Sequence, residues 1–274
     1  EGCGDCGVQS NCVAVMPLDT EFGRKRAIDQ SNCNKDFSCV NGFCPSFVTL
    51  EGAQLRKSKA GLSAPNDDFP ALPEPQSATL DGRPYNILIT GIGGTGVITI
   101  GALLGMAAHL EGKGVSVLDM TGMSQKNGSV TSHVRIAPTP MAIHAQRIAT
   151  GEANLILGCD MLTAGAQETI AKTRPGVTVA IINTHEQPPG TFAQQPDWQF
   201  PTETVRALID ESVAGRAHFV DATRLATALL GDAIASNLFR VRQSIADAAR
   251  ACTRSSDAIR LIAVSKGHPK AAIA

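Results

Sequence analysis

Residues 86–105 limit the fold of this chain more than any other part of its sequence. The first five, residues 86–90, are mostly apolar and too few for a helix, so they predict a buried strand. From Val97 onward apolar residues recur without a proline for about fifteen positions, which predicts a helix. Between the two lies a turn built on four glycines: Gly91, Gly93, Gly94 and Gly96.

This glycine loop predicts a site for an anion. Glycine allows positive φ angles and a close approach of the backbone to a ligand. The loop amides and the helix N-terminus then point outward together and favour a negative group. The spacing Gly91-x-Gly93-x-x-Gly96 matches a dinucleotide fingerprint, and Asp119 ends the next predicted strand, where an acid would contact a ribose. The alternative is that the glycines only allow tight packing of the strand on the helix.

Further strands and helices alternate after this unit. Apolar segments predict strands at residues 115–119, 130–136, 154–158, 177–182 and 217–220. Helical patterns lie at 161–172, 202–214 and 224–230. This order predicts an α/β domain: a Rossmann-like, mostly parallel sheet with helices on both faces. Ligands of such sheets bind at the carboxyl ends of the strands, where the chain places Asp119, Asp160, Asn183 and Asp221.

Composition excludes several classes of partner. The 274 residues carry a net charge of -1 and only 18% charged residues, so we expect neither a nucleic acid nor a membrane as partner. No apolar run is long enough to cross a bilayer, and no signal peptide is visible. The chain starts at Glu1, without a methionine and inside a cysteine pattern, which indicates a fragment of a cytoplasmic protein.

Six of the eight cysteines lie within the first 44 residues: Cys3, Cys6, Cys12, Cys33, Cys39 and Cys44. A segment so poor in large apolar side chains needs cross-links to fold. Disulfides and structural zinc are both possible, but only one Cys-x-x-Cys pair is present and the rest of the chain is typical of an intracellular domain. The mixed spacing and the Cys44-Pro45 ending favour a ferredoxin-like iron-sulfur module with one or two [4Fe-4S] clusters.

The chain therefore divides into four parts. Residues 1–56 form the cysteine-rich module, and residues 57–83, with four prolines inside a dozen positions, form an extended linker. Residues 84–239 form the α/β domain, and residues 240–274 form a basic, alanine-rich tail of different origin. A shifted reading frame or a chimeric assembly would explain that tail.

The chain shows no complete catalytic constellation. The turn at residues 121–129 combines Lys126 with several amide and hydroxyl groups, which suits a phosphate or a carboxylate, although a solvated loop is the alternative. We expect His133, which lies in a predicted strand, to be a surface or satisfied histidine rather than a catalytic one.

Two sets of motifs resemble one enzyme family. Cys3-Gly-Asp-Cys6, Ser31-Asn-Cys33 and Gly42-Phe-Cys44-Pro45 resemble the cluster segment of fused indolepyruvate ferredoxin oxidoreductases. Gly91-Ile-Gly-Gly-Thr-Gly96, Gln125-Lys-Asn-Gly128 and Ser132-His-Val-Arg135 resemble the γ, or POR-type, domain of 2-oxoacid:ferredoxin oxidoreductases. The likeness covers residues 1–239.

The resemblance implies a function. The family decarboxylates a 2-oxoacid on thiamine diphosphate, passes electrons through [4Fe-4S] clusters to ferredoxin, and often releases an acyl-CoA. By this resemblance the six cysteines become candidate cluster ligands. The glycine loop, with Gln125, Lys126 and Gly128, becomes part of a surface that faces substrate or CoA and contacts other parts of the enzyme.

The thiamine-binding motif is absent from this sequence, so the isolated chain should not turn over substrate. We therefore expect the partners to be ferredoxin, the remaining thiamine-binding domains and further copies of the same enzyme. Two other functions remain open: an iron-sulfur reductase that binds NAD(P) or flavin, and a zinc-stabilised module without enzymatic activity.

Overall fold

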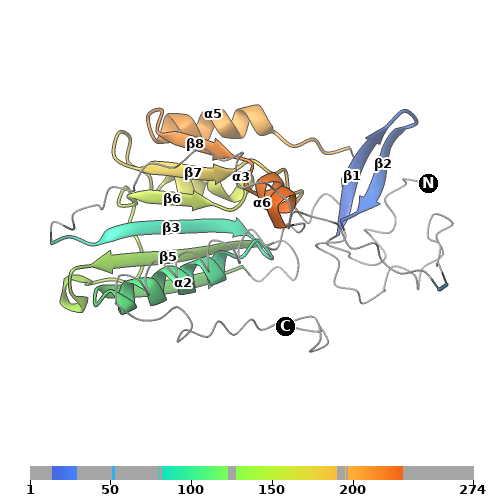
Figure 1. The fold of residues 1–274 in the computed structure, drawn as a ribbon. Coiled ribbons are helices and arrows are strands. Elements are labelled where there is room, and N and C mark those ends of the chain that lie inside the picture. Colours follow the sequence, from blue (N-terminus) through green and yellow to red (C-terminus); the bar gives the residue numbers. More distant parts are fainter. Residues whose placement is uncertain are drawn as a thin grey trace.

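The computed structural model describes residues 14–29, 51–52, 80, 82–122, 128–189, 195 and 197–230. Within this part of the chain lie a two-stranded hairpin and a six-stranded sheet (Figure 1). The hairpin consists of β1 (Val15–Thr20) and β2 (Gly23–Ile28), paired antiparallel. It lies within the segment predicted as a cysteine-rich module, whose six cysteines are outside the described residues. Its Arg24 Nη1 donates a 2.7 Å hydrogen bond to the backbone oxygen of Trp198.

The six-stranded sheet has the strand order β4-β5-β3-β6-β7-β8. Its strands are β3 (Tyr85–Ile92), β4 (Gly114–Thr121), β5 (Ser129–Ala137), β6 (Leu155–Gly158), β7 (Val179–Asn183) and β8 (Ala217–Val220). Strands β3, β6, β7 and β8 pair parallel to one another. The sheet is thus mostly parallel, as the sequence predicts.

Strand β5 is the exception, because it pairs antiparallel with both β3 and β4. Every other strand of the sheet runs in the opposite direction. Only residues 122–128 connect β4 to β5, and so short a connection suits a hairpin rather than a parallel crossover. The helix α2 (Val97–Leu110) connects β3 to β4, and β5 fills the position between them.

Helices cover both faces of the sheet, as predicted (Figure 1). Helix α2 packs against β3, β4 and β5 on one face. The predicted helix at 161–172 is in fact two short helices, α3 (Met161–Ala164) and α4 (Gln167–Ile170), because Ala166 has an extended backbone. The remaining helices are η3 (Pro140–Ala142), α5 (Thr202–Ser212) and α6 (Ala222–Leu230). Among the described helices none has both the length and the apolar character required to cross a bilayer.

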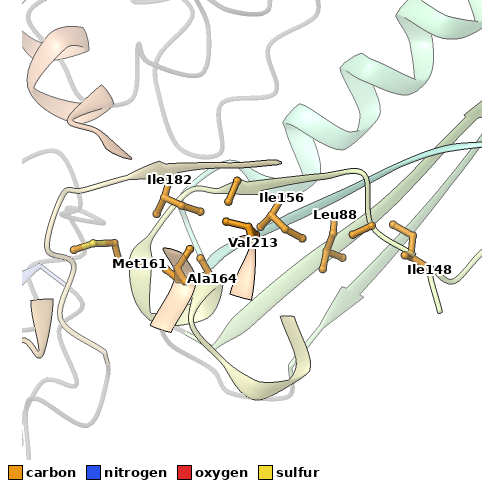
Figure 2. Close-up of a cluster of buried hydrophobic side chains, with 10 residues drawn as sticks. Leu88, Ile148, Ile156, Met161, Ala164, Ile182 and Val213 are labelled. Atoms are coloured by element: carbon orange, nitrogen blue, oxygen red, sulfur yellow. The ribbon is translucent and has the colours of Figure 1, made fainter. Parts of the chain in front are cut away.

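Two hydrophobic clusters form the core, one on each face, and both depend on β3. Leu88 joins the larger cluster, together with Ile156, Met161, Ile182 and Val213 (Figure 2). Ile87 and Ile89 point the other way and pack with Val97 and Val134 beneath α2. Alternate side chains of a strand point to opposite faces, so a strand between two helical layers must be apolar at nearly every position. The sequence of β3 meets this requirement.

Candidate functional site

The glycine loop leads from the carboxyl end of β3 into the N-terminus of α2. Gly94 and Gly96 adopt φ angles of 95° and 84°, a region in which other residues are strained. Gly91 is required for a different reason, because a Cβ atom there would lie 2.3 Å from Thr95 Oγ1 and 2.9 Å from Cys159 Cβ. The glycines thus serve both purposes that the sequence suggests, a tight turn and close packing.

Hydrogen bonds hold this loop against the start of β5. The Gly93 amide donates to the Gly128 carbonyl oxygen at 2.9 Å, and the Gly122 amide donates to Ser129 O at 3.1 Å. The Thr95 amide and hydroxyl both donate to Ile92 O. The structure therefore brings together two segments that the resemblance assigns to one surface, the four loop glycines and Gly128.

Gln125 and Lys126 lie outside the described residues. The segment that carries them leaves the sheet at Gly122 and returns at Gly128, so both of its ends lie at the carboxyl edge of β3 and β4. The first turn of α2 adds amides that have no acceptor within the helix. This combination of glycine backbone and helix N-terminus can accept an anion.

Asp160 follows a predicted strand, where the sequence suggests a ligand. In the structure it instead supports the glycine loop through a hydrogen bond from the Ile92 amide. It is 1% exposed, and its carboxylate accepts hydrogen bonds from the Ile92 amide at 2.9 Å and from the Thr163 amide at 3.0 Å. The Thr163 hydroxyl also donates to it. Burial raises the pKa of Asp160, and the hydrogen bonds from Thr163, Ile92 and Leu162 oppose that rise. The carboxylate thus caps α3 and fixes the last residue of β3 before the loop.

The other polar strand ends have structural roles too. Asn183 Nδ2 donates to Cys159 O at 3.1 Å and to Thr223 Oγ1 at 3.0 Å, which ties β6 and β7 to α6. Asp221 caps the start of α6, since its Oδ1 accepts from the Arg224 amide at 2.9 Å. Asn183 and Asp221, which the sequence places as possible ligands at the carboxyl ends of the strands, therefore make contacts within the fold instead.

Asp119 does not occupy the position expected of a ribose-binding acid. Such an acid ends the strand next to the one that precedes the glycine loop. Here β5 lies between β3 and β4, and Asp119 pairs with Ser132 on β5. Its Oδ1 lies 3.6 Å from the place of a Cβ at Gly101, beneath the middle of α2. The geometry gives no support to a dinucleotide fingerprint.

The sequence leaves open whether His133 is a surface or a satisfied histidine, and the structure shows that it is buried and hydrogen-bonded. Its Nδ1 accepts a 3.1 Å hydrogen bond from the Ile148 amide, and the residue is 3% exposed. Burial, and then the positive charges of Arg147, Lys172 and Arg135, lower the pKa of His133 from 6.5 to about 4. The imidazole is therefore neutral near pH 7.

Arg135 belongs to a buried polar network that the sequence does not reveal. Its Nε donates to Asn86 Oδ1 at 2.9 Å and its Nη1 to Ala145 O at 2.8 Å. Asn86 in turn donates from Nδ2 to Glu152 O at 2.8 Å. Since Asn86 and Arg135 face each other across β3 and β5, the network locks the register of this pair at the end remote from the glycine loop. Thus Arg135, the last residue of the family-like segment 132–135, serves the fold.

The predicted cluster ligands lie outside the described residues, so the iron-sulfur module stays a prediction. Among the described residues no group of three or more His, Cys, Asp or Glu side chains is arranged to hold a metal ion. Cys159, which lies next to Gly91, is not among the predicted ligands.

Gly91→Ala should destabilise the domain by about 2–3 kcal/mol, because an added methyl group in a packed site forces its neighbours apart. The nearest atoms, on Thr95, Val97 and Cys159, would lie 2.3, 2.6 and 2.9 Å from the new Cβ. Gly94→Ala is the control, since its added Cβ meets no atom within 4 Å. This change costs only the backbone strain of a positive φ angle, about 1–2 kcal/mol. Urea unfolding measures both, and equal losses would contradict the packing argument.

Comparison with known proteins places this site in a family. The family model described as "Pyruvate ferredoxin/flavodoxin oxidoreductase" matches residues 86–241, more than half of the chain. The chain belongs to this family. The match begins at the second residue of β3 and includes the glycine loop, both faces of the sheet and α6, so the resemblance stated for the α/β domain is confirmed.

Related proteins of known name are subunits of indolepyruvate oxidoreductases. The subunit IorB of Pyrococcus horikoshii is 31% identical over 156 residues, which are 57% of this chain and 74% of that protein. IorB of Methanothermobacter thermautotrophicus is 31% identical over 127 residues, or 46% of this chain, and the match spans only 61% of that relative's length. This chain is thus similar to oxidoreductase subunits.

The solved structures that match this chain have low sequence identity to it. Pyruvate oxidoreductase subunit PORC from Thermotoga maritima matches 64% of this chain and 95% of its own, with a TM-score of 0.41 and 15% identity. A 2-oxoglutarate:ferredoxin oxidoreductase from Magnetococcus marinus matches 61% of this chain and 27% of its own, with a TM-score of 0.43 and 15% identity.

Proposed function

We propose that this chain is the electron-transfer and γ-type part of a thiamine-diphosphate-dependent 2-oxoacid:ferredoxin oxidoreductase that oxidatively decarboxylates indolepyruvate or related aryl pyruvates. The observation that carries the proposal is the family match over residues 86–241 directly downstream of six clustered cysteines. The names of the IorB relatives support an aryl 2-oxoacid as substrate. Thiamine diphosphate would be bound by other parts of the enzyme.

In this proposal the cysteine-rich module holds one or two [4Fe-4S] clusters. Six thiols are available and a cubane cluster needs four thiolate ligands, so the donor set fits one cluster, and a second would need ligands from outside this sequence. A cluster held there would supply one-electron transfer toward ferredoxin. The protein contributes position and a low-dielectric environment that sets the potential.

The glycine loop gives the α/β domain its part in the reaction. Gly93 and Gly128 join the loop to the segment that carries Gln125 and Lys126, and the N-terminus of α2 opens beside them. We assign this surface to an anionic group, either the 2-oxoacid carboxylate or a phosphate of CoA. Amides of the loop and the ammonium group of Lys126 would orient that group.

Cys44→Ala tests the cluster assignment. The anaerobically purified chain should be brown, contain iron and labile sulfide, and give a low-temperature EPR signal of a reduced cubane cluster. Removing one thiolate should abolish or alter that signal, since the cluster then lacks a ligand or takes a replacement. Cys252→Ala is the matched control, because this cysteine lies outside the pattern and its loss should leave the spectrum unchanged.

Two results would count against the cluster. A folded, colourless protein without iron would remove the electron-transfer role, and stoichiometric zinc would favour the non-enzymatic alternative. NAD(P) or flavin bound to the purified chain would favour the reductase alternative instead.

A further inference from the structure

A hydrogen bond joins the hairpin of β1 and β2 to the α/β domain. Arg24 Nη1 in β2 donates to the backbone oxygen of Trp198 at 2.7 Å, across 174 positions of the chain. Arg24 belongs to the segment predicted as a cysteine-rich module, whereas Trp198 lies between β7 and α5. The bond therefore connects two parts of the chain that the sequence predicts to be separate domains.

The Arg24 side chain is held at this contact. In a two-stranded hairpin a long charged side chain usually extends into water. Here the side chain is only 25% exposed, and its Nε is buried and lies 3.6 Å from Oδ1 of Asp19, the residue paired with Arg24 across the hairpin. Removing part of a guanidinium group from water is unfavourable unless the group gains a good acceptor. The Trp198 carbonyl is such an acceptor, at the short distance typical of a charge-assisted hydrogen bond.

The acceptor is fixed to the hydrophobic core. The Trp198 ring packs edge-on against Phe200, with the ring centroids 5.6 Å apart. Phe200 in turn packs against the larger hydrophobic cluster, and the Trp198 amide donates to Gln195 O at 3.0 Å. A donor that meets an acceptor already held in place loses less conformational entropy than one that must order a loop. Residues 197–200, called here the Trp198 segment, are therefore a preformed receptor for Arg24.

The Trp198 segment lies at the same edge of the sheet as the glycine loop. It follows β7 and leads into α5 at Thr202. Strands β3, β6 and β7 run parallel, so the glycine loop after β3 and the connection after β7 both leave the carboxyl edge of the sheet. Figure 1 shows the hairpin on the side toward which these strands point. Arg24 thus holds the hairpin at the edge that carries the candidate anion site.

The hairpin connects both halves of the cysteine pattern. The Asp29 amide donates to Ala14 O at 2.8 Å, which closes the hairpin at the end opposite to its turn. In the sequence Cys12 comes two positions before Ala14 and Cys33 four positions after Asp29, although both cysteines lie outside the described residues. A contact that holds the hairpin therefore also tethers the segments that carry these cysteines.

We propose that Arg24 docks the cysteine-rich segment on the α/β domain, with the Trp198 segment as its receptor, and so tethers that segment at the edge of the glycine loop. This inference goes beyond the proposed function, because the contact does not depend on what the cysteines bind. Under the proposed function, Arg24 would be a positioning residue that keeps the clusters on the side of the domain where the anion site lies.

A small contact is enough for this role, because the two parts belong to one chain. A flexible linker of the length predicted for residues 57–83 spans roughly 30 Å. Parts joined by such a linker meet at an effective concentration on the order of 1 mM. An interface much smaller than the ~800 Å² per partner of a stable complex can then keep them together.

Hydrogen–deuterium exchange of the full chain, purified without oxygen and read by mass spectrometry, tests the contact. In Arg24→Ala the peptide that contains residues 197–202 should exchange roughly tenfold faster, the factor that corresponds to the loss of one hydrogen bond to a charged group. The radius of gyration from small-angle X-ray scattering should also increase, because the linker alone then joins the two parts. Peptides of β3 and β7 should keep their wild-type exchange rates, which shows that the α/β domain is folded.

Lys25→Ala is the matched control. Lys25 is the next residue of β2 and also a cation, but its side chain points to the opposite face of the hairpin from that of Arg24. This variant should change neither the exchange of residues 197–202 nor the radius of gyration. If Arg24→Ala unpairs the hairpin, seen as fast exchange of residues 15–28, Arg24→Met replaces it and must show the same changes, since its unbranched side chain covers the strand without a donor.

Wild-type exchange at residues 197–202 in a folded Arg24 variant would overturn the proposal, and so would equal changes in Lys25→Ala. Faster exchange with an unchanged radius of gyration would overturn it too, since Arg24 would then order only the Trp198 segment. Iron-free protein that shows the expected exchange pattern would contradict the proposed function and leave the docking contact in place.

Discussion

Asp160→Ala is expected to destabilise the α/β domain by about 2–5 kcal/mol. The change removes the cap of α3, a loss of about 1–2 kcal/mol. It also removes the acceptor of the buried Ile92 amide, the Asp160 carboxylate oxygen at 2.9 Å. A buried amide without an acceptor costs about 1–3 kcal/mol more. The measurement is the free energy of unfolding in urea, read by circular dichroism.

Asp221→Ala provides the control for this prediction. Asp221 also caps a helix, but it is part-exposed and supports no amide of the glycine loop. Its replacement should cost about 1 kcal/mol, the value of a helix cap alone. If both variants lose the same free energy of unfolding, Asp160 stabilises the domain only as a helix cap, and its support of the glycine loop adds no stability.

His133 should make the domain less stable in acid by about 3 kcal/mol. In the unfolded chain its pKa is near 6.5, whereas the folded protein lowers the pKa to about 4. Between these pH values His133 binds a proton in the unfolded chain but not in the folded protein, so stability falls as the pH drops from about 6.5 to about 4. Above about pH 6.5 this loss of stability is absent, and below about pH 4 it is complete. The shift of 2.5 pH units corresponds to about 3 kcal/mol.

Urea unfolding at several pH values from 4 to 7 measures this effect. His133→Asn should flatten the slope in that window, because the amide keeps an acceptor for the Ile148 amide but does not titrate. His144→Asn is the control for replacing a histidine by asparagine, since this histidine is exposed. The raised pKa of Asp160 acts in the opposite sense and is common to all variants. An unchanged slope in His133→Asn would show that folding does not lower the pKa of His133.

The strands of the sheet were predictable because each has a distinct apolar pattern. The predicted strand at residues 86–90 is observed at Tyr85–Ile92, and the one at 217–220 is observed at Ala217–Val220. The direction of β5 was not predictable, since an apolar pattern shows that a strand exists but not how it runs. The break between α3 and α4 at Ala166 was not predictable either, because the apolar pattern continues through it.

The candidate site was predictable only in part. Local sequence identified the glycine loop, because positive φ angles and tight turns select glycine within a few residues. The role of Asp160 was missed, since Asp160 and Ile92 lie 68 positions apart. An aspartate directly before the start of a helix, as at Asp160, is typical of a helix cap, and this is the signal that could have identified its structural role. Arg135 and Asn86 form a similar long-range pair, which only the register of β3 and β5 reveals.

The central position of β3 has a consequence for how the domain unfolds. Leu88 supports one hydrophobic cluster, and Ile87 and Ile89 support the other. Neither helical layer can therefore detach without loosening the strand on which the opposite layer depends. We expect the two layers to be lost in a single cooperative transition, with no populated intermediate in which one side of the sheet is bare.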